Sequence, residues 1–127
     1  MIHIVESTKS VDAAARDLDA AAKAHGFGVL HVYDLREKLR EKGIDFSKEC
    51  RILEVCNPKQ AAAVLGANMK MSLALPCRIS VYEDGGKTWI GTLLPTELLS
   101  VFPGSEDLQG VAAKVEEAML LMIAEAR

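Results

Sequence analysis

Two short cysteine motifs hold the residues best suited to chemistry in this sequence. One motif spans Glu54–Pro58 and the other spans Pro76–Ile79. A cysteine thiolate is a nucleophile and a metal ligand, and the Arg78 guanidinium binds anions. Each motif lies where a predicted strand meets a loop or a helix, a common position for binding groups in α/β proteins. The motifs therefore mark the candidate functional site, although neither defines a reaction.

Cys56 directly precedes a predicted helix. Asn57 is a preferred N-cap residue, and Pro58 suits the first helical position. The helix N-terminus, with Arg78 nearby, would favour an anion, which is either a bound ligand or the Cys56 thiolate itself. The first possibility predicts a binding site and the second predicts Cys56 as a catalytic nucleophile. The alternative is a packing role, because free cysteine is often a small buried residue.

Strand alternation predicts which side chains share a face. Leu53 and Val55 are expected in the core, so Glu54 and Cys56 lie on the opposite face. By the same argument Cys77 belongs to the core, and Arg78 and Tyr82 belong to the more polar face. We expect Glu54 to pair with Arg78, since a carboxylate inside a strand needs a partner; the alternative is that Glu54 contacts a ligand. The predicted ligand-binding set is Glu54, Cys56, Asn57, Arg78 and Tyr82.

No metal site is predicted, although the sequence contains soft ligands. Cys56, Cys77, Met69, Met71, His25 and His31 are the possible donors. They form no Cys-x-x-Cys or His-x-x-x-His pair, and alternation directs the two motif cysteines to opposite faces. No other motif identifies a cofactor, which remains unknown. Residues 26–28 (Gly-Phe-Gly) precede a strand, whereas a dinucleotide-binding loop follows one.

Composition describes a globular protein of ordinary size. The chain has 127 residues, half of them hydrophobic, and a net charge of −3. We expect one domain, residues 1–127. Acidic and basic residues are mixed, which argues against nucleic-acid binding. We expect neither membrane insertion nor secretion, because no apolar run is long enough and the N-terminus lacks a signal pattern. Three cysteines without an export signal indicate a reducing cytoplasm.

Hydrophobic periodicity and turn residues predict the elements that position the motifs. Strands are expected near residues 2–6, 27–33, 51–56, 76–82 and 87–94, the last two forming a hairpin at Gly85 and Gly86. Helices are expected from residue 11, after Asp34, from Pro58, after Pro95 and from Ser105 to the C-terminus. The predicted fold is α+β: a two-layer α/β sandwich with one mixed or antiparallel sheet of about five strands packed against helices.

The last predicted helix is more hydrophobic than a one-sided surface helix needs to be. Residues 119–123 read Met-Leu-Leu-Met-Ile. We therefore expect part of this helix to contact a second subunit.

The motifs resemble those of the domain-of-unknown-function family numbered 302. The resemblance rests on Gly26-Phe27, on the strand ending in Glu54–Pro58, and on residues 75–83 (Leu-Pro-Cys-Arg-Ile-Ser-Val-Tyr-Glu). It extends over nearly the whole chain. It implies a compact two-layer α/β fold, commonly found as a homodimer, with no established activity and no catalytic role for the motif residues.

Three functional hypotheses follow from these observations. The first is a cytoplasmic, homodimeric module that binds a small molecule, specifically an anion, at the Cys56-Asn57-Pro58 junction near Arg78. The second is a thiol redox or sulfur-handling enzyme with Cys56 as its nucleophile. The third is a structural or interaction protein in which the motifs serve packing and helix capping alone.

Overall fold

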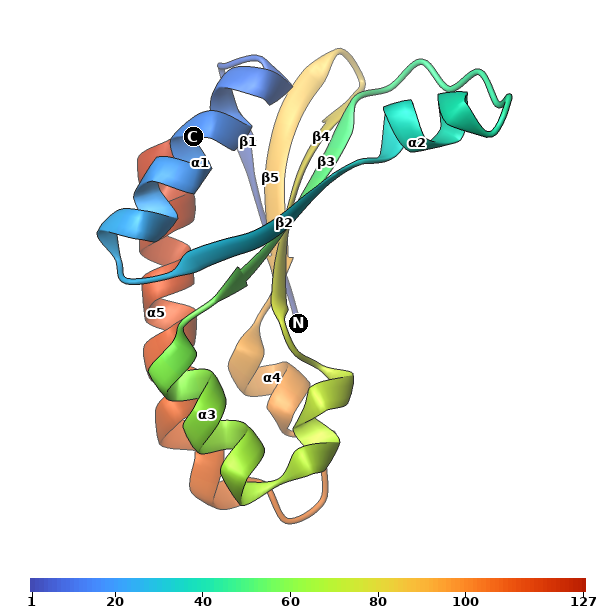
Figure 1. Ribbon diagram of the computed structural model, residues 1–127. Coiled ribbons are helices and arrows are strands. Elements are labelled where there is room, and N and C mark those ends of the chain that lie inside the picture. Colours follow the sequence, from blue (N-terminus) through green and yellow to red (C-terminus); the bar gives the residue numbers. More distant parts are fainter.

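A five-stranded sheet forms the centre of the protein, whose computed structural model describes residues 1–127 (Figure 1). The strands lie in the order β1-β5-β4-β3-β2, and all neighbours are antiparallel. Their bounds are β1 Ile2–Ser7, β2 Gly28–Asp34, β3 Cys50–Cys56, β4 Cys77–Asp84 and β5 Lys87–Leu93. The predicted two-layer fold and the β4–β5 hairpin are confirmed, and the sheet is wholly antiparallel.

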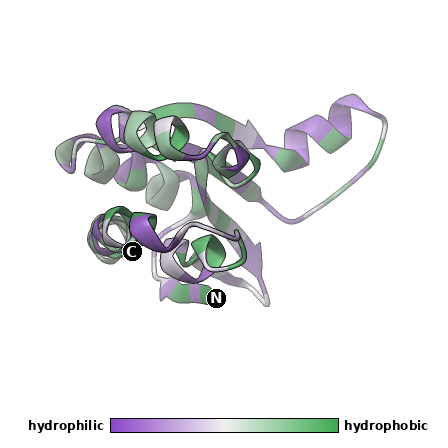
Figure 2. Ribbon diagram, turned by 90° about the horizontal axis from the view of Figure 1, so that it is seen from below, coloured by the Kyte–Doolittle hydropathy of each residue, from purple (hydrophilic) through white to green (hydrophobic).

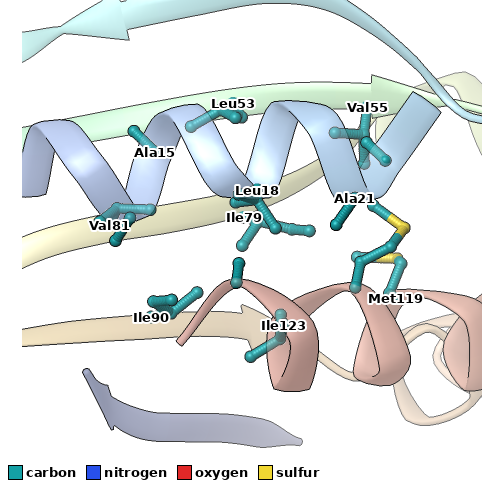
Figure 3. Packing of buried hydrophobic residues seen from close by; sticks show 14 of the residues in the cluster. Ala15, Leu18, Ala21, Leu53, Val55, Ile79, Val81, Ile90, Met119 and Ile123 are labelled. Atoms are coloured by element: carbon teal, nitrogen blue, oxygen red, sulfur yellow. The ribbon is translucent and has the colours of Figure 1, made fainter. Parts of the chain in front are cut away.

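Helices α1 (Val11–Ala24) and α5 (Gln109–Ala126) cover one face of the sheet (Figure 1). The N-cap of α1 is Ser10, whose Oγ accepts a hydrogen bond from the Ala13 amide at 3.1 Å. Figure 3 shows the apolar side chains of both helices pointing toward those of β3, β4 and β5. The fully buried residues of this core include Leu18, Leu53, Val55, Ile79, Val81, Ile90, Met119, Met122 and Ile123.

The remaining helices, apart from α2, gather at one end of the sheet. They are α3 (Pro58–Ala67), the 3-10 helix η1 (Met69–Leu73), α4 (Pro95–Leu99) and the 3-10 helix η2 (Glu106–Leu108). Together with α5 they bury a second, smaller apolar cluster made of Met71, Leu99, Leu108 and Ala112. This end of the molecule contains the candidate site.

Helix α2 (Leu35–Glu41) stands apart from the other helices. Asp34 caps it, accepting a hydrogen bond from the Glu37 amide, and none of its residues is buried. In Figure 2 it projects to the right as a mainly hydrophilic helix. The loop that follows it exposes two large apolar side chains, Ile44 and Phe46.

No helix in the structure is both long and apolar enough to cross a bilayer.

The element order agrees with the sequence prediction, with two local differences. Residues 69–73, for which the sequence predicted no helix or strand, form η1. The final α-helix begins at Gln109 instead of Ser105, and η2 precedes it. Ser105 does not cap this helix, because its hydroxyl donates to the carbonyl oxygens of Leu99 and Phe102.

Candidate ligand-binding cavity

A cavity of about 770 Å³ lies between α3, η1, α4 and the N-terminal half of α5. The ends of β3, β4 and β5 border its remaining side. Of the 28 residues that line it, 21 are hydrophobic. Its size is within the range of ligand-binding cavities, roughly 300–1,000 Å³, which are usually apolar with a few polar groups. Three of the five predicted ligand-binding residues line it: Cys56, Asn57 and Arg78.

Both motif cysteines line this cavity although they belong to different faces of the sheet. Cys77 pairs with Val55 in the β3–β4 register and packs against the main core, as predicted. Cys56 comes directly after Val55, at the last position of β3, and therefore lies on the opposite face of the sheet. The three cysteines are free thiols. Burial raises the pKa of the Cys77 thiol to about 11, and the nearby Cys56 adds to the shift. Cys77 is therefore protonated at neutral pH.

Glu54 and Arg78 form the predicted ion pair at the mouth of the cavity. They lie directly opposite each other on β3 and β4, with Arg78 Nε 3.6 Å from Glu54 Oε2. The Glu54 side chain is only 12% exposed, whereas that of Arg78 is 63% exposed. Arg78 lines the cavity and Glu54 does not. Glu54 therefore contacts the guanidinium at Nε, and most of the Arg78 side chain stays exposed.

Tyr33 completes this polar cluster, and the sequence reasoning missed it. Its hydrogen bond to Glu54 raises the pKa of the Tyr33 hydroxyl, and the negative charge of Glu54 adds to the shift. The His31 ring packs edge-on against the Tyr33 ring with centroids 4.3 Å apart. A bulge between Val29 and His31 makes this arrangement possible, because it brings His31 opposite Glu54 and Tyr33 opposite Ile52.

Tyr82 lies apart from the site although it shares the face of Arg78. It pairs with Cys50 on β3 and Trp89 on β5. Four residues along β4 separate it from Arg78, which corresponds to about 13 Å. The structure therefore brings together four of the five predicted residues and leaves Tyr82 out.

The start of α3 is built as its sequence predicts. The Asn57 side chain accepts a hydrogen bond from the Gln60 amide at 3.2 Å. The Asn57 backbone carbonyl accepts one from the Ala61 amide at 2.9 Å. Pro58 has no N–H group to donate. Of the first-turn amides, only that of Lys59 lacks a hydrogen bond within the protein. The N-terminus of α3 is thus largely satisfied by its own cap, and Arg78 is the only cationic side chain that lines the cavity.

A Schellman turn at the end of α1 positions Phe27, another residue of the cavity lining. Gly26 has a φ of 79°, a conformation that glycine adopts without steric cost. This turn lets the Phe27 amide donate to the Ala22 carbonyl at 2.9 Å. Phe27 is consequently buried between the main core and the cavity.

Large apolar side chains surround the cavity entrance, and we call them the rim: Leu30, Leu73, Leu93 and Val101. Their exposures are 62%, 83%, 48% and 64%, yet all four line the cavity. Arg78 is the only lining residue with a charged side chain. The site therefore offers a large apolar volume, an apolar entrance and a single positive charge.

The donors considered for a metal do not converge. No group of three His, Cys, Asp or Glu side chains has the geometry to hold an ion. Cys56 and Cys77 are the only such side chains that line the cavity.

Comparison with known proteins agrees with the sequence resemblance. The model of the family described as "Domain of unknown function DUF302" matches residues 3–126. The chain belongs to this family. No curated protein matches it. The match includes both cysteine motifs and nearly the whole fold.

A solved structure of the same family has nearly the same fold. It is the crystal structure of an uncharacterized conserved DUF302 protein from Bacillus stearothermophilus, with 36% sequence identity and a TM-score of 0.92. The similarity covers 99% of this chain and 98% of that chain. The fold is thus shared over nearly the full length of both proteins.

Proposed function

We propose that this protein binds a small, mainly apolar molecule with one anionic group in the cavity beside Cys56 and Arg78. The observation that carries the proposal is the cavity itself, about 770 Å³ with 21 hydrophobic residues among the 28 that line it. An apolar volume of this size that opens to solvent stabilises an apolar guest, since each buried methylene contributes about 0.8 kcal/mol.

Arg78 is the group that would hold the anionic end of the ligand. Its single ionic contact is the one to Glu54, and its Nη atoms have no partner within the protein. A guanidinium carries five N–H donors and binds a carboxylate in a bidentate geometry. The predicted anion site is therefore retained, but it centres on Arg78 and depends less on the α3 N-terminus than the sequence alone indicated.

Binding of 1-anilinonaphthalene-8-sulfonate, an apolar fluorophore with one negative charge, tests the proposal. Ala61 lines the cavity from α3, so Ala61→Trp fills part of it. Ala63 lies on the exposed side of the same helix, and Ala63→Trp is the matched control. We expect saturable binding by the native protein, a loss of at least about tenfold in affinity in Ala61→Trp and no change in Ala63→Trp. Equal affinity in all three proteins would disprove binding in this cavity.

The same proposal includes a homodimer that forms through the uncovered side of the sheet. We call this surface the open face: Ile4, Ile52, Tyr82 and Trp89 form its apolar part. Ile4 is 46% exposed, and no element of the chain packs over this surface. Glu6 and Lys87 are paired at 3.4 Å, and Glu54 and Arg78, which also lie on this face, are paired at 3.6 Å, so these charged side chains have partners within the chain. The exposed loop after α2, with Ile44 and Phe46, gives a second copy further apolar surface.

The final helix is a poorer candidate for this interface than the sequence indicated. Met119, Met122 and Ile123 are buried against α1 and the sheet of the same chain. Leu121, 47% exposed, is the only large apolar residue of α5 with an exposed side chain. The excess hydrophobicity of the helix is thus used within the chain, which is why we assign the interface to the open face.

A thiol enzyme is the second candidate function. The observation in its favour is that Cys56 and Cys77 line one cavity, so a nucleophile and a resolving thiol would meet the same ligand. The pH dependence of Cys56 alkylation tests it. A midpoint near that of an ordinary thiol, about 8.5, would argue against an activated Cys56. Either function fits a reducing cytoplasm, where free thiols are stable.

A further inference from the structure

We infer that the ligand is a medium- or long-chain monocarboxylate, that is, an aliphatic acid. This inference rests on the proposed binding function and assigns its ligand class. The carboxylate would lie at Arg78, and the chain would extend past the rim toward Met71, Leu99 and Leu108. Four features of the cavity support this class over polar, aromatic or polyanionic ligands.

The first feature is the shortage of hydrogen-bonding groups inside the cavity. Its polar lining residues besides the cysteines and Arg78 are Asn57, Gln60, Ser72 and Thr92. Asn57 is engaged with the Gln60 amide, and the Thr92 hydroxyl donates to the Arg78 carbonyl at 2.7 Å. A nucleotide or a sugar would leave several buried polar atoms unpaired, each costing about 1–3 kcal/mol. The body of the ligand is therefore apolar.

The second feature is the aliphatic character of the lining. Phe27 and Phe102 are its only aromatic members, and the others are chiefly leucine, valine, alanine, methionine and proline. Planar aromatic ligands are usually held by stacking on aromatic side chains, which prefer offset or edge-to-face geometry. Flexible aliphatic side chains instead pack well around a flexible chain.

The third feature is charge. Arg78 is the only cationic residue in the lining, and the nearby Glu54 is negatively charged. One guanidinium matches one carboxylate in bidentate geometry. A phosphate dianion or a diphosphate would meet too little positive charge beside Glu54. The head group is therefore a monoanion.

The fourth feature is the path into the cavity. The rim residues Leu30, Leu73, Leu93 and Val101 are exposed at the entrance and line the interior as well. Arg78 and Leu93 belong to the strands that form this entrance, β4 and β5. A carboxylate at Arg78 consequently stays near solvent while its chain passes the rim.

Calorimetric titration with octanoate, decanoate and dodecanoate, below the concentrations at which they form micelles, tests the chain. Each two-carbon extension is expected to increase the affinity about 15-fold, until the cavity is filled. Dodecanol tests the head group in the unmodified protein, and we expect it to bind about tenfold more weakly than dodecanoate. No gain with chain length, or equal affinity for the acid and the alcohol, would overturn the inference.

Two variants of Arg78 and one control variant locate the head group. Arg78→Gln should weaken dodecanoate binding about tenfold and leave dodecanol binding unchanged, and Arg78→Lys should restore part of the loss. Lys70→Gln, which removes a charge from η1 outside the cavity lining, should change neither. If Arg78→Gln weakens both ligands equally, the carboxylate assignment is wrong.

Titration with 1-anilinonaphthalene-8-sulfonate separates the proposal that the cavity binds a ligand from the proposal that this ligand is an aliphatic acid. Fluorophore binding that Ala61→Trp abolishes, without chain-length dependence for the acids, would refute only the aliphatic acid. Absence of binding by the fluorophore, the acids and dodecanol would refute the cavity function as well.

Discussion

At the scale of single residues, the two motif cysteines differ in what their surroundings allow. Cys77 lies on the core side of β4, where burial raises the pKa of its thiol to about 11. It therefore behaves as a small apolar residue at neutral pH. Cys56 lies at the end of β3 beside the ion pair of Glu54 and Arg78. A chemical role for a thiol in this protein belongs to Cys56 first.

The raised pKa of Cys77 predicts a loss of stability at alkaline pH. Above about pH 9 the unfolded chain releases the thiol proton, while the folded protein keeps it until about pH 11. The unfolded state then binds fewer protons, so the free energy of unfolding falls as pH rises through this interval. The expected loss is on the order of 2 kcal/mol.

Urea unfolding at several pH values between neutrality and pH 11 measures this effect. The Cys77→Ala variant lacks the thiol and should lose less stability over the same interval. Parallel pH profiles for the two proteins would show that Cys77 does not titrate in this way. The comparison cancels the other groups that titrate at high pH, since both proteins contain them.

At the scale of elements, local sequence signals account for most of the fold. Asn57 and Pro58 predicted the start of α3, and Leu53 and Val55 predicted the buried face of β3; the structure confirms both. The bulge at Leu30 has no comparable signal. A one-residue shift in a strand exchanges its two faces, so Tyr33 could not be assigned to Glu54 from the sequence alone.

The cavity also lies beyond sequence reasoning, for a different reason. Its walls come from α3, α4 and α5, and their packing depends on contacts between residues far apart in the chain. Periodicity identifies the apolar side of each helix. It does not report whether three such sides meet tightly or leave a space.

Removal of the α3 cap tests the element that carries Asn57. Asn57→Ala leaves the Gln60 amide without its acceptor, and the free energy of unfolding should fall by about 1 kcal/mol. Asn57→Asp keeps an acceptor at the same position and should retain most of the stability. An Asp variant as unstable as the Ala variant would show that the cap bond is not the cause.

The surroundings of Gly91 and Gly110 predict opposite effects of replacing each glycine with alanine. A Cβ atom at Gly91 would lie 3.0 Å from Ile4 Cγ1 and 3.3 Å from the His3 carbonyl oxygen. Gly91→Ala should therefore lower the free energy of unfolding by roughly 1–3 kcal/mol. At Gly110, in α5, a Cβ atom would meet nothing within 4 Å, so Gly110→Ala should raise the free energy of unfolding by about 0.5–1 kcal/mol.

Thermal or urea unfolding of both glycine variants measures these changes. If Gly91→Ala is as stable as the native protein, the β1–β5 contact at Ile4 is looser than the structure indicates. Gly110→Ala controls for the general effect of replacing glycine on the unfolded chain.

At the scale of the whole molecule, the sheet has one face covered by helices and one open face (Figure 1). Trp89 lies on the open face, and Leu121 is the exposed apolar residue of α5. In sedimentation equilibrium we expect the native protein to be a dimer. Trp89→Asp should weaken the dimer at least about 100-fold, because a buried unpaired charge at an interface is costly.

The matched substitution Leu121→Asp separates the open face from α5. We expect Leu121→Asp to remain dimeric. A monomeric Leu121→Asp protein with a dimeric Trp89→Asp protein would assign the interface to α5 instead. A native protein that is monomeric at every concentration would exclude both.

The most direct test of the cavity function uses the methionine methyl groups as reporters. Of the five methionines, Met71 lines the cavity, Met119 and Met122 lie in the main core, and Met1 and Met69 are exposed. We would titrate methyl-labelled protein with 1-anilinonaphthalene-8-sulfonate and record methyl NMR spectra. Binding in the cavity predicts a large, saturable shift of the Met71 signal with little change at Met119 and Met122. An unmoved Met71 signal at saturation, or equal shifts at all five, would contradict it.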